Sequence, residues 1–442
     1  MQITLRRPRI IIPLTYDLQG LRAWCTIVAL GVLKWVAVLA GVGDRLHAAA
    51  IANRLWPLFV VALYLRETVS LFLRPNIYIF ILALYGILGV LSENAFVDVV
   101  TDAVVMFLPA IFWRNLRDTE TTTPDRYAEF LDTYFRLNLL GMFMITLPGM
   151  AFDGGAGMDW NFLIPVFLAR IFTSHIFMDV VLYGILFVAA AALSLSTKTA
   201  LGNIAIAAVS LTRGKLRYIL AGSLVAILVV AISLPFILET TAGTKLSLLL
   251  NNVNISGLMN LPLSNLVFNP VLIFSFLDVS SGERIFELLQ ALNRINQDWF
   301  HFLFGFGLGS GIDVSGTMDK SVLRAHSGDT EDVRVVHLAI TWFLLKGGMV
   351  GLTAYLASSL WAIWNAIQNI RLLVIFRDYK WIWFGNVSAL LIWFSMQFAI
   401  ANYIKLPLIA ISLMAVLIGR ELRAVYRKRK SIQSHSGAEV IS

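Results

Sequence analysis

The side chains of this sequence that could do chemistry gather in one polar stretch, roughly residues 239 to 334, and in His337 soon after it. The stretch carries Arg284 and Arg294, whose guanidinium groups could bind an anionic headgroup. His337 could exchange a proton near neutral pH, because an unperturbed imidazole titrates at about pH 6.5. We therefore expect proton transfer and anion binding in this part of the chain.

Metal chemistry is not expected of the same residues. His301, His326 and His337 do not have the spacing of metal ligands, and the acids Asp329 and Glu331 stand in one short polar run. The single Cys25 allows neither a disulfide framework nor a thiolate metal site within one chain. We expect no cofactor.

Composition sets the class of protein that must position these side chains. Hydrophobic residues make up 58% of the 442 residues, charged residues 14%, and the mean hydropathy is +0.77. Such a chain has too little polar surface to cover a soluble globule, so we expect an all-α, polytopic membrane protein. The net charge of +8 lies mostly in short runs beside apolar segments, which suit membrane lipids rather than nucleic acid.

Windows of about 19 residues predict about twelve transmembrane helices. Their expected ranges are 24–42, 48–65, 77–91, 95–113, 134–152, 161–178, 180–196, 199–211, 218–238, 336–365, 380–400 and 403–419. The prediction divides the chain into an N-terminal bundle (1–238), a polar loop domain (239–335), C-terminal spans (336–419) and a basic tail (420–442).

Lys and Arg crowd alternate connections between these spans, and such connections face the cytoplasm. The basic set comprises Arg66 and Arg74; Arg114, Arg117 and Arg126; Arg213, Lys215 and Arg217; Arg371, Arg377 and Lys380; and both termini, including Arg427 to Lys430. The polar loop domain, Lys198 and His337 then share the outer, periplasmic compartment. Both termini are expected in the cytoplasm.

The polar loop is expected to contain an amphipathic helix and a glycine turn. Ser280 and Glu283 match a capping box, and apolar residues from Ile285 to Trp299 follow at helical spacing. The opposite face carries Arg284, Glu287 and Arg294. On pattern alone, this face could equally be a solvated helix face. Alternating glycines at 305–311 indicate a tight turn whose backbone approaches a ligand or a neighbouring helix.

Three motifs follow one another in this half of the chain. The first is Leu-Ser-Leu-Ser-Thr-Lys-Thr-Ala-Leu at 193–201; the second is Gly-Glu-Arg-Ile at 282–285, about twenty residues before the glycine run; in the third, His337 opens a span followed by Gly348 and Gly351. Together they cover roughly 187–356 and resemble the O-antigen ligase and O-antigen polymerase family. This chain departs from the family pattern at Leu338, usually Asn, and at Thr197-Lys198, usually Ser-Arg.

The resemblance implies a metal-independent, membrane-embedded glycosyltransferase of the GT-C type, whose donor is a glycan on a polyprenyl diphosphate, such as undecaprenyl diphosphate, in a bacterial inner membrane. It assigns His337 as the catalytic base and Arg284 as a catalytic cation on the departing diphosphate. The expected diphosphate- or glycan-binding residues are Lys198, Arg294, Arg170 and Arg334. Lys198 could equally end a span by snorkelling. Arg170 must face a cavity or partner, or mark a re-entrant segment.

Three functions stay open. The first is polymerisation of lipid-linked repeat units into O-antigen or exopolysaccharide, and Leu338 favours it slightly over the second. The second is a ligase of lipopolysaccharide biosynthesis, which would transfer the glycan to lipid A core. The third is a transporter of polysaccharide or lipid-linked glycan, although the main polar break falls after nine predicted spans and not after six. A chain-length regulator or a flippase is a possible protein partner.

Overall fold

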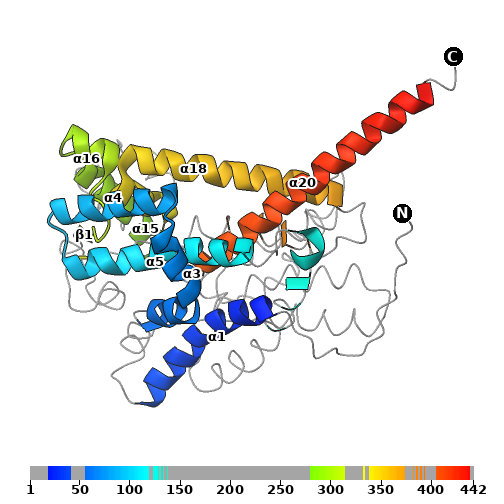
Figure 1. Ribbon diagram of the computed structural model, residues 1–442. Coiled ribbons are helices and arrows are strands. Elements are labelled where there is room, and N and C mark those ends of the chain that lie inside the picture. Colours follow the sequence, from blue (N-terminus) through cyan, green and yellow to red (C-terminus); the bar gives the residue numbers. More distant parts are fainter. Residues whose placement is uncertain are drawn as a thin grey trace, which may run out of the picture.

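The computed structural model describes residues 18–40, 55–118, 123–127, 279–313, 332–333, 338–373 and 405–438, with single residues between 129 and 137 and between 382 and 393. These residues are mainly helical (Figure 1). The helices are α1 (Leu18–Leu39), α3 (Leu65–Leu73), α4 (Ile77–Leu91), α5 (Phe96–Asp118), α15 (Val279–Ile295), α16 (Trp299–Phe304), α18 (Ala339–Leu373) and α20 (Lys405–Ala438). Two short strands, β1 (Ile312–Asp313) and β2 (Asp332–Val333), pair antiparallel.

The helical class predicted from composition is confirmed for this part of the chain, and its apolar helices are consistent with a membrane protein. Within the described ranges, two helices, 96–117 and 339–372, are long and apolar enough to cross a membrane, and a bent pair could supply a third. The predicted span 77–91 coincides with α4, and those at 95–113, 336–365 and 403–419 overlap α5, α18 and α20. The predicted spans from 134 to 238, the span at 380–400 and most of the polar loop lie largely outside the described residues, so the count of twelve stays a prediction.

The predicted span 48–65 is described from residue 55, and the helix found there ends at a sharp bend. Two helices, Leu55–Leu63 and Leu65–Leu73, meet at an angle of 82°. Tyr64 between them has φ −113° and ψ 36°, outside the helical region. The guanidinium of Arg22 donates to the carbonyl of Leu63 at 2.9 Å and to both carboxylate oxygens of Glu67 at 3.1 Å. The side chain of Arg22 thus satisfies a carbonyl that the break exposes, which hydropathy alone does not reveal.

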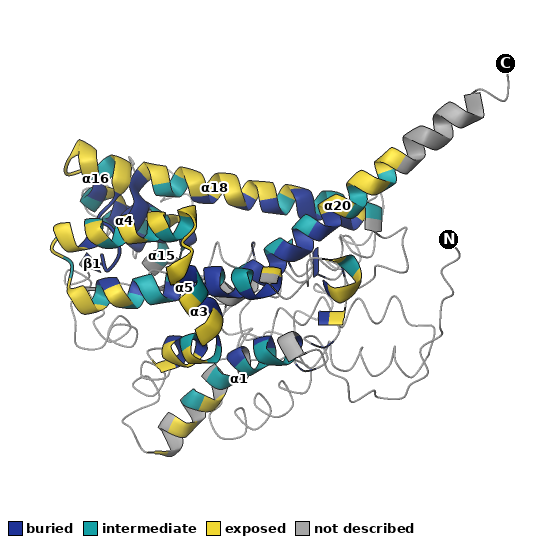
Figure 2. Ribbon diagram, viewed as in Figure 1, coloured by how far each residue is buried: buried dark blue, intermediate teal, exposed yellow. Residues whose placement is uncertain are grey.

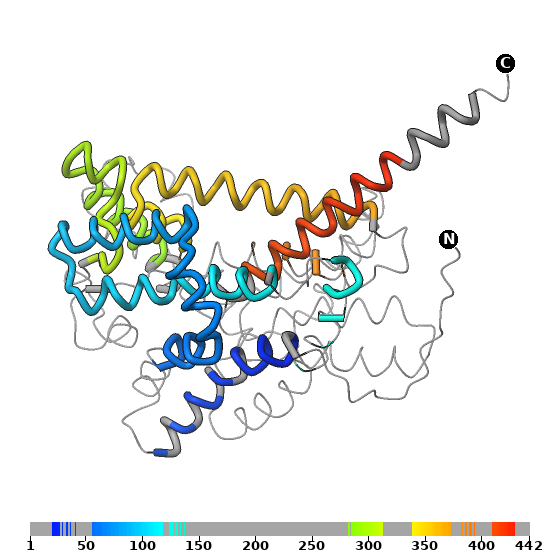
Figure 3. Tube along the Cα trace, viewed as in Figure 1, coloured from blue at the N-terminus to red at the C-terminus, as the bar shows by residue number. Residues whose placement is uncertain are grey.

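Helices α4 and α5 form an antiparallel hairpin whose outer face is apolar. Figure 3 traces the chain along α4, through a turn that contains Glu93, and back along α5. Large apolar side chains on α4 are exposed, and much of the ribbon of this helix is coloured as exposed in Figure 2. They are Ile77, Phe80, Ile81, Leu84, Ile87, Val90 and Leu91. In a chain with apolar spans, such a face suits contact with lipid.

Helix α20 continues well past its apolar part. It packs against α5 and α18 and then runs without a break to Ala438, so its C-terminal end projects from the rest of the chain (Figure 1). The segment 420–438, predicted as a basic tail, is therefore a continuation of helix α20.

The amphipathic helix predicted after Ser280 is present as α15, although its faces differ from the prediction. The helix packs against α18 and buries Phe286, Leu289 and Ile295. Glu287, expected on the charged face, is also buried, whereas Leu292 is exposed. Packing against a neighbouring helix, and not the interface between water and lipid, therefore decides which face of α15 is covered.

The glycine run follows α16 and docks against two helices at once. The backbone N–H groups of Phe306 and Gly307 donate to the carbonyls of Leu345 and Lys346 on α18, at 2.9 and 3.0 Å. On its other side, Leu308 donates to the carbonyl of Tyr85 on α4 at 3.0 Å. Gly348, with φ 58°, interrupts the regular conformation of α18 at this point. The predicted close backbone approach is confirmed, and the partners are helices.

Only glycine fits this contact. Gly305, Gly307 and Gly309 have φ of 71°, 72° and 81°, in the left-handed region that side chains disfavour. A Cβ on Gly307 would lie 2.2 Å from the backbone nitrogen of Gly89 on α4. The loop and the hairpin therefore meet backbone to backbone.

Two glycines of α4 test this contact. A Cβ on Gly89 would lie 2.2 Å from the carbonyl oxygen of Leu308, whereas a Cβ on Gly86 meets no atom within 4 Å. Both changes to alanine gain about 1 kcal/mol in helix propensity, so Gly86→Ala is a matched control. We expect Gly89→Ala to lower the melting temperature of the purified protein by several degrees, and Gly86→Ala to leave it unchanged or raise it. Equal melting temperatures for the two variants would contradict the docked position of the loop.

Candidate functional site

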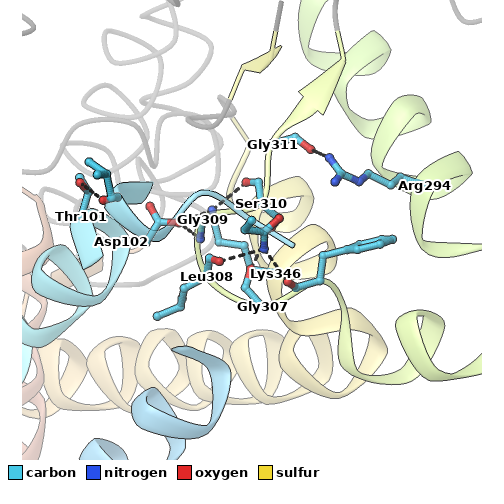
Figure 4. A network of polar contacts seen from close by, with 12 residues as sticks. Thr101, Asp102, Arg294, Gly307, Leu308, Gly309, Ser310, Gly311 and Lys346 are labelled. Carbon is cyan, nitrogen blue, oxygen red and sulfur yellow. Dashed lines mark hydrogen bonds and ion pairs between the residues drawn. The ribbon is translucent and has the colours of Figure 1, made fainter. Parts of the chain in front are cut away.

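A buried ion pair joins the glycine loop to two apolar helices. Lys346 on α18, only 2% exposed, pairs through Nζ with the carboxylate of Asp102 on α5 (Figure 4). The same ammonium donates to the carbonyl of Ser310 at 3.0 Å, and the backbone N–H of Gly309 donates to Asp102 Oδ2 at 2.7 Å. The hydroxyl of Ser310 donates to the carbonyl of Gly307 at 2.9 Å. The loop therefore supplies hydrogen-bond partners to both members of the ion pair, and the pair satisfies two backbone groups of the loop.

The pair lies at matching depth in its two helices. Asp102 is six residues after the start of α5 and Lys346 seven after the start of α18, or about 9–10 Å along each axis. Both helices begin at the same end of the bundle, where α16 and β1 also lie (Figure 1). A charge inside a span costs about 2.5–3.5 kcal/mol even on the lowest scales, so such residues are expected to be paired and to mark function.

Sequence analysis missed this pair. The signal was available, since Asp102 and Lys346 are charges inside the predicted spans 95–113 and 336–365. An ionisable residue within a span is by default a site hypothesis with a partner to be found. The sequence could not, however, identify the partner across 244 residues.

Arg294, a predicted binding residue, lies beside the glycine loop. Its Nη1 donates to the carbonyl of Gly311, and its Cζ lies 4.7 Å from the centroid of the Phe306 ring. A guanidinium has five N–H donors, of which this contact uses one. The arginine thus holds the far end of the loop and places a positive charge next to it.

Arg284, the predicted catalytic cation, is half-buried on the same helix, and its Nε atom is buried. It stands ten positions before Arg294, which corresponds to about 15 Å along the axis of α15. The structure therefore does not bring the two predicted arginines together on one group. A diphosphate bound by Arg294 would be out of reach of Arg284 unless the ligand extends along the helix.

The other predicted residues, His337, Lys198, Arg170 and Arg334, lie outside the described residues. The neighbours of His337 and Arg334 are described. Leu338, directly after His337, accepts a backbone hydrogen bond from Trp342 in the first turn of α18 at 3.0 Å. Val333, directly before Arg334, pairs with Ile312 across the two strands.

The structure adds a histidine that sequence analysis considered only as a metal ligand. Nδ1 of His301 lies 2.5 Å from Oδ2 of Asp298, and its backbone N–H donates to Oδ1 of the same residue at 2.8 Å. These hydrogen bonds, the backbone one first, hold the pKa of Asp298 below its usual range, so the group is a carboxylate at neutral pH. The imidazole stacks on Phe306 at 4.0 Å between centroids. The Asp-x-x-His spacing at a helix start was the available signal.

The arrangement offers cations, an oriented imidazole and a glycine backbone at one end of the bundle. No group of three or more His, Cys, Asp or Glu side chains within the described segments is arranged to hold a metal ion. Comparison with known proteins finds no family model that matches the chain and no curated protein that matches it. The assignment of function therefore depends on the residues of this chain.

The ion pair can be tested by removing one charge or both. Lys346→Met keeps an unbranched stem but leaves the carboxylate of Asp102 buried without its cation, which costs about 3–5 kcal/mol. We expect a clear loss of stability to chemical denaturation, and a smaller loss in the double variant Asp102→Asn/Lys346→Met. Arg126→Met is the control, because the Arg126–Glu129 pair is 70% and 66% exposed and should contribute little. Wild-type stability of Lys346→Met would show that the pair is not formed.

Proposed function

We propose that this chain is a membrane glycosyltransferase that polymerises polyprenyl-diphosphate-linked oligosaccharide repeat units into O-antigen or exopolysaccharide. The observation that supports it best is the docking of the polar α15–α16–glycine loop segment between the α4–α5 hairpin and the start of α18. This docking holds Arg294 at the end of the bundle that the charge pattern predicts to be periplasmic. His337, the proposed base, directly precedes Leu338 at the start of the same α18.

The proposed chemistry needs two kinds of group. Breaking the bond between the anomeric carbon and the diphosphate releases a leaving group of high negative charge, which fixed cations stabilise as the charge develops. The hydroxyl of the acceptor sugar loses its proton as it attacks, and a neutral imidazole can accept that proton. Arg294 and Lys198 are proposed for the first task, and His337 is proposed for the second. Arg284, about 15 Å from Arg294 along α15, is proposed to share the first task with a donor that extends along the helix.

Ligation of the finished glycan to lipid A core uses the same groups and the same donor. Leu338, in the place where the resembling family usually has Asn, favours the polymerase. A second class of function, a transporter for lipid-linked glycan, has support of its own. An ion pair inside two apolar helices and a helix interrupted at Gly348 are features that transporters use to bind and move substrates.

The surface glycan of a deletion strain separates these functions. Loss of a polymerase should leave single repeat units on the surface. Loss of a ligase should leave lipid A without glycan while lipid-linked polymer persists, and loss of a transporter should trap repeat units on the cytoplasmic side. We expect the first pattern. A normal glycan profile in the deletion strain would exclude all three.

Substitutions at Arg284 test the proposed cation. Arg284→Ala should lower turnover at least about a hundredfold while the protein still folds, the scale of one lost transition-state donor. Arg284→Lys should restore part of the rate, because lysine keeps the charge without the planar fork. The measurement is turnover with purified lipid-linked donor, and Gln297→Ala, an exposed change in the same segment, is the control. Near-normal turnover of Arg284→Ala would assign the arginine to the packing of α15.

A further inference from the structure

His301 is an oriented and accessible imidazole for which the proposed reaction has no role so far. Its side chain is 24% exposed, and Nδ1 contacts the carboxylate of Asp298. A carboxylate only accepts hydrogen bonds, so Nδ1 carries the proton of this contact. The stacking on Phe306, 13° from parallel, fixes the plane of the ring. Nε2 is therefore the atom that can donate to a ligand or accept from one.

Phe306 places this imidazole next to a permanent cation. The imidazole of His301 stacks on the Phe306 ring at 4.0 Å between centroids, and Cζ of Arg294 lies 4.7 Å from the centroid of the same ring. Phe306 itself is buried and hydrogen-bonded into the docked loop, where its backbone donates to Leu345 and accepts from Asn94 at 2.8 Å. The imidazole and the guanidinium therefore both contact the ring of one buried side chain.

We propose that His301 is a catalytic acid on the departing diphosphate, with Arg294 beside it as the fixed cation. This inference rests on the proposed glycosyl transfer. As the bond between the anomeric carbon and the diphosphate oxygen breaks, its electron pair goes to that oxygen, which takes the Nε2 proton of the His301 imidazolium. The acceptor hydroxyl oxygen forms the new bond to the anomeric carbon, and its proton goes to His337. The Asp298 carboxylate accepts the hydrogen bond from Nδ1–H of His301 throughout.

The charged groups around the stack suit this role. Asp298 on the edge of α16 is the counter-charge of the imidazolium. Arg294 of α15 contacts the same Phe306 ring. Lys346 of α18, the helix that packs against α16, is already neutralised by Asp102. Trp299 and Phe300, the exposed apolar neighbours of His301, suit the boundary between lipid and water. The diphosphate of a polyprenyl donor lies at that boundary.

The pH dependence of turnover tests the proposal. With purified lipid-linked donor, the wild type should give a bell-shaped profile, because His337 must be neutral and His301 protonated. His301→Gln should lower the maximum turnover at least about tenfold and abolish the decrease of turnover at alkaline pH. His337→Gln should abolish glycan transfer. Asp298→Asn keeps a good helix cap but removes the carboxylate that orients the imidazole, so it should lower the maximum turnover while the protein still folds. An unchanged pH profile in His301→Gln overturns the proposal, as does wild-type turnover in Asp298→Asn. Gln297→Ala is the control.

Binding of inorganic diphosphate to the purified full-length protein, at pH 6 and pH 8.5, gives a readout apart from activity. The wild type should bind diphosphate more tightly at pH 6 than at pH 8.5. His301→Gln should lose this gain in affinity, whereas Gln297→Ala should keep it. Equal pH dependence of binding in wild type and His301→Gln overturns the proposal. If His301→Gln loses the affinity gain but the wild type turns over no lipid-linked donor, His301 belongs to a diphosphate site and the proposed glycosyltransferase function is wrong. If the wild type transfers glycan and His301→Gln matches it in both turnover and diphosphate binding, the proposed function is supported but His301 is not its catalytic acid.

Discussion

The fold of the described residues depends on the burial of one ammonium and one carboxylate between two apolar helices. Lys346 and Asp102 could not be held there by each other alone, because two desolvated charges cost more than their attraction returns unless the remaining hydrogen bonds are also made. The glycine loop supplies these bonds through the N–H of Gly309 and the carbonyl of Ser310. The buried pair therefore requires a polar segment inside the bundle, and its hydrogen bonds to the pair fix the position of the glycine loop.

This requirement explains the other unusual features of the region. A loop that enters between two helices must satisfy its own backbone, and it does so by bonding to the carbonyls of Tyr85, Leu345 and Lys346. The approach is close enough that no side chain fits, hence glycines with positive φ facing Gly89 on one side and Gly348 on the other. The interruption of α18 at Gly348 is part of the same contact: a Cβ there would lie 2.5 Å from the backbone of Gly305. Breaking any one of these contacts leaves others without partners.

Hydropathy and periodicity predicted the elements better than the contacts between them. The ends of α4 could be predicted to the residue because its apolar run is bounded by Asn76, which caps the helix, and by a polar turn. The glycine run was interpreted correctly as a close backbone approach, because alternating glycines have few other uses. The bend at Tyr64 and the burial of Glu287 could not be predicted, since each is stabilised by tertiary contacts. Local pattern also put Arg284 and Arg294 on one charged face of α15, although a distance of about 15 Å along the axis separates them. His337, Lys198, Arg170 and Arg334 remain predictions.

The position of the glycine loop bears on how a membrane protein could work on a substrate that is half lipid and half sugar. The apolar side chains of Trp299 and Phe300 are exposed beside the polar contacts of Asp298 and His301, so α16 presents an apolar and a polar surface within one helical turn. A polyprenyl diphosphate changes from apolar to highly charged over a similar length. Phe306 is hydrogen-bonded into the docked loop, and His301 and Arg294 both contact its ring, so the loop restrains both polar groups. Such groups lose little free energy to reorganisation when charge develops, which is the condition for stabilising a transition state more than the bound donor. The buried pair of Asp102 and Lys346, although it is too enclosed to meet a ligand, contributes by keeping that support rigid.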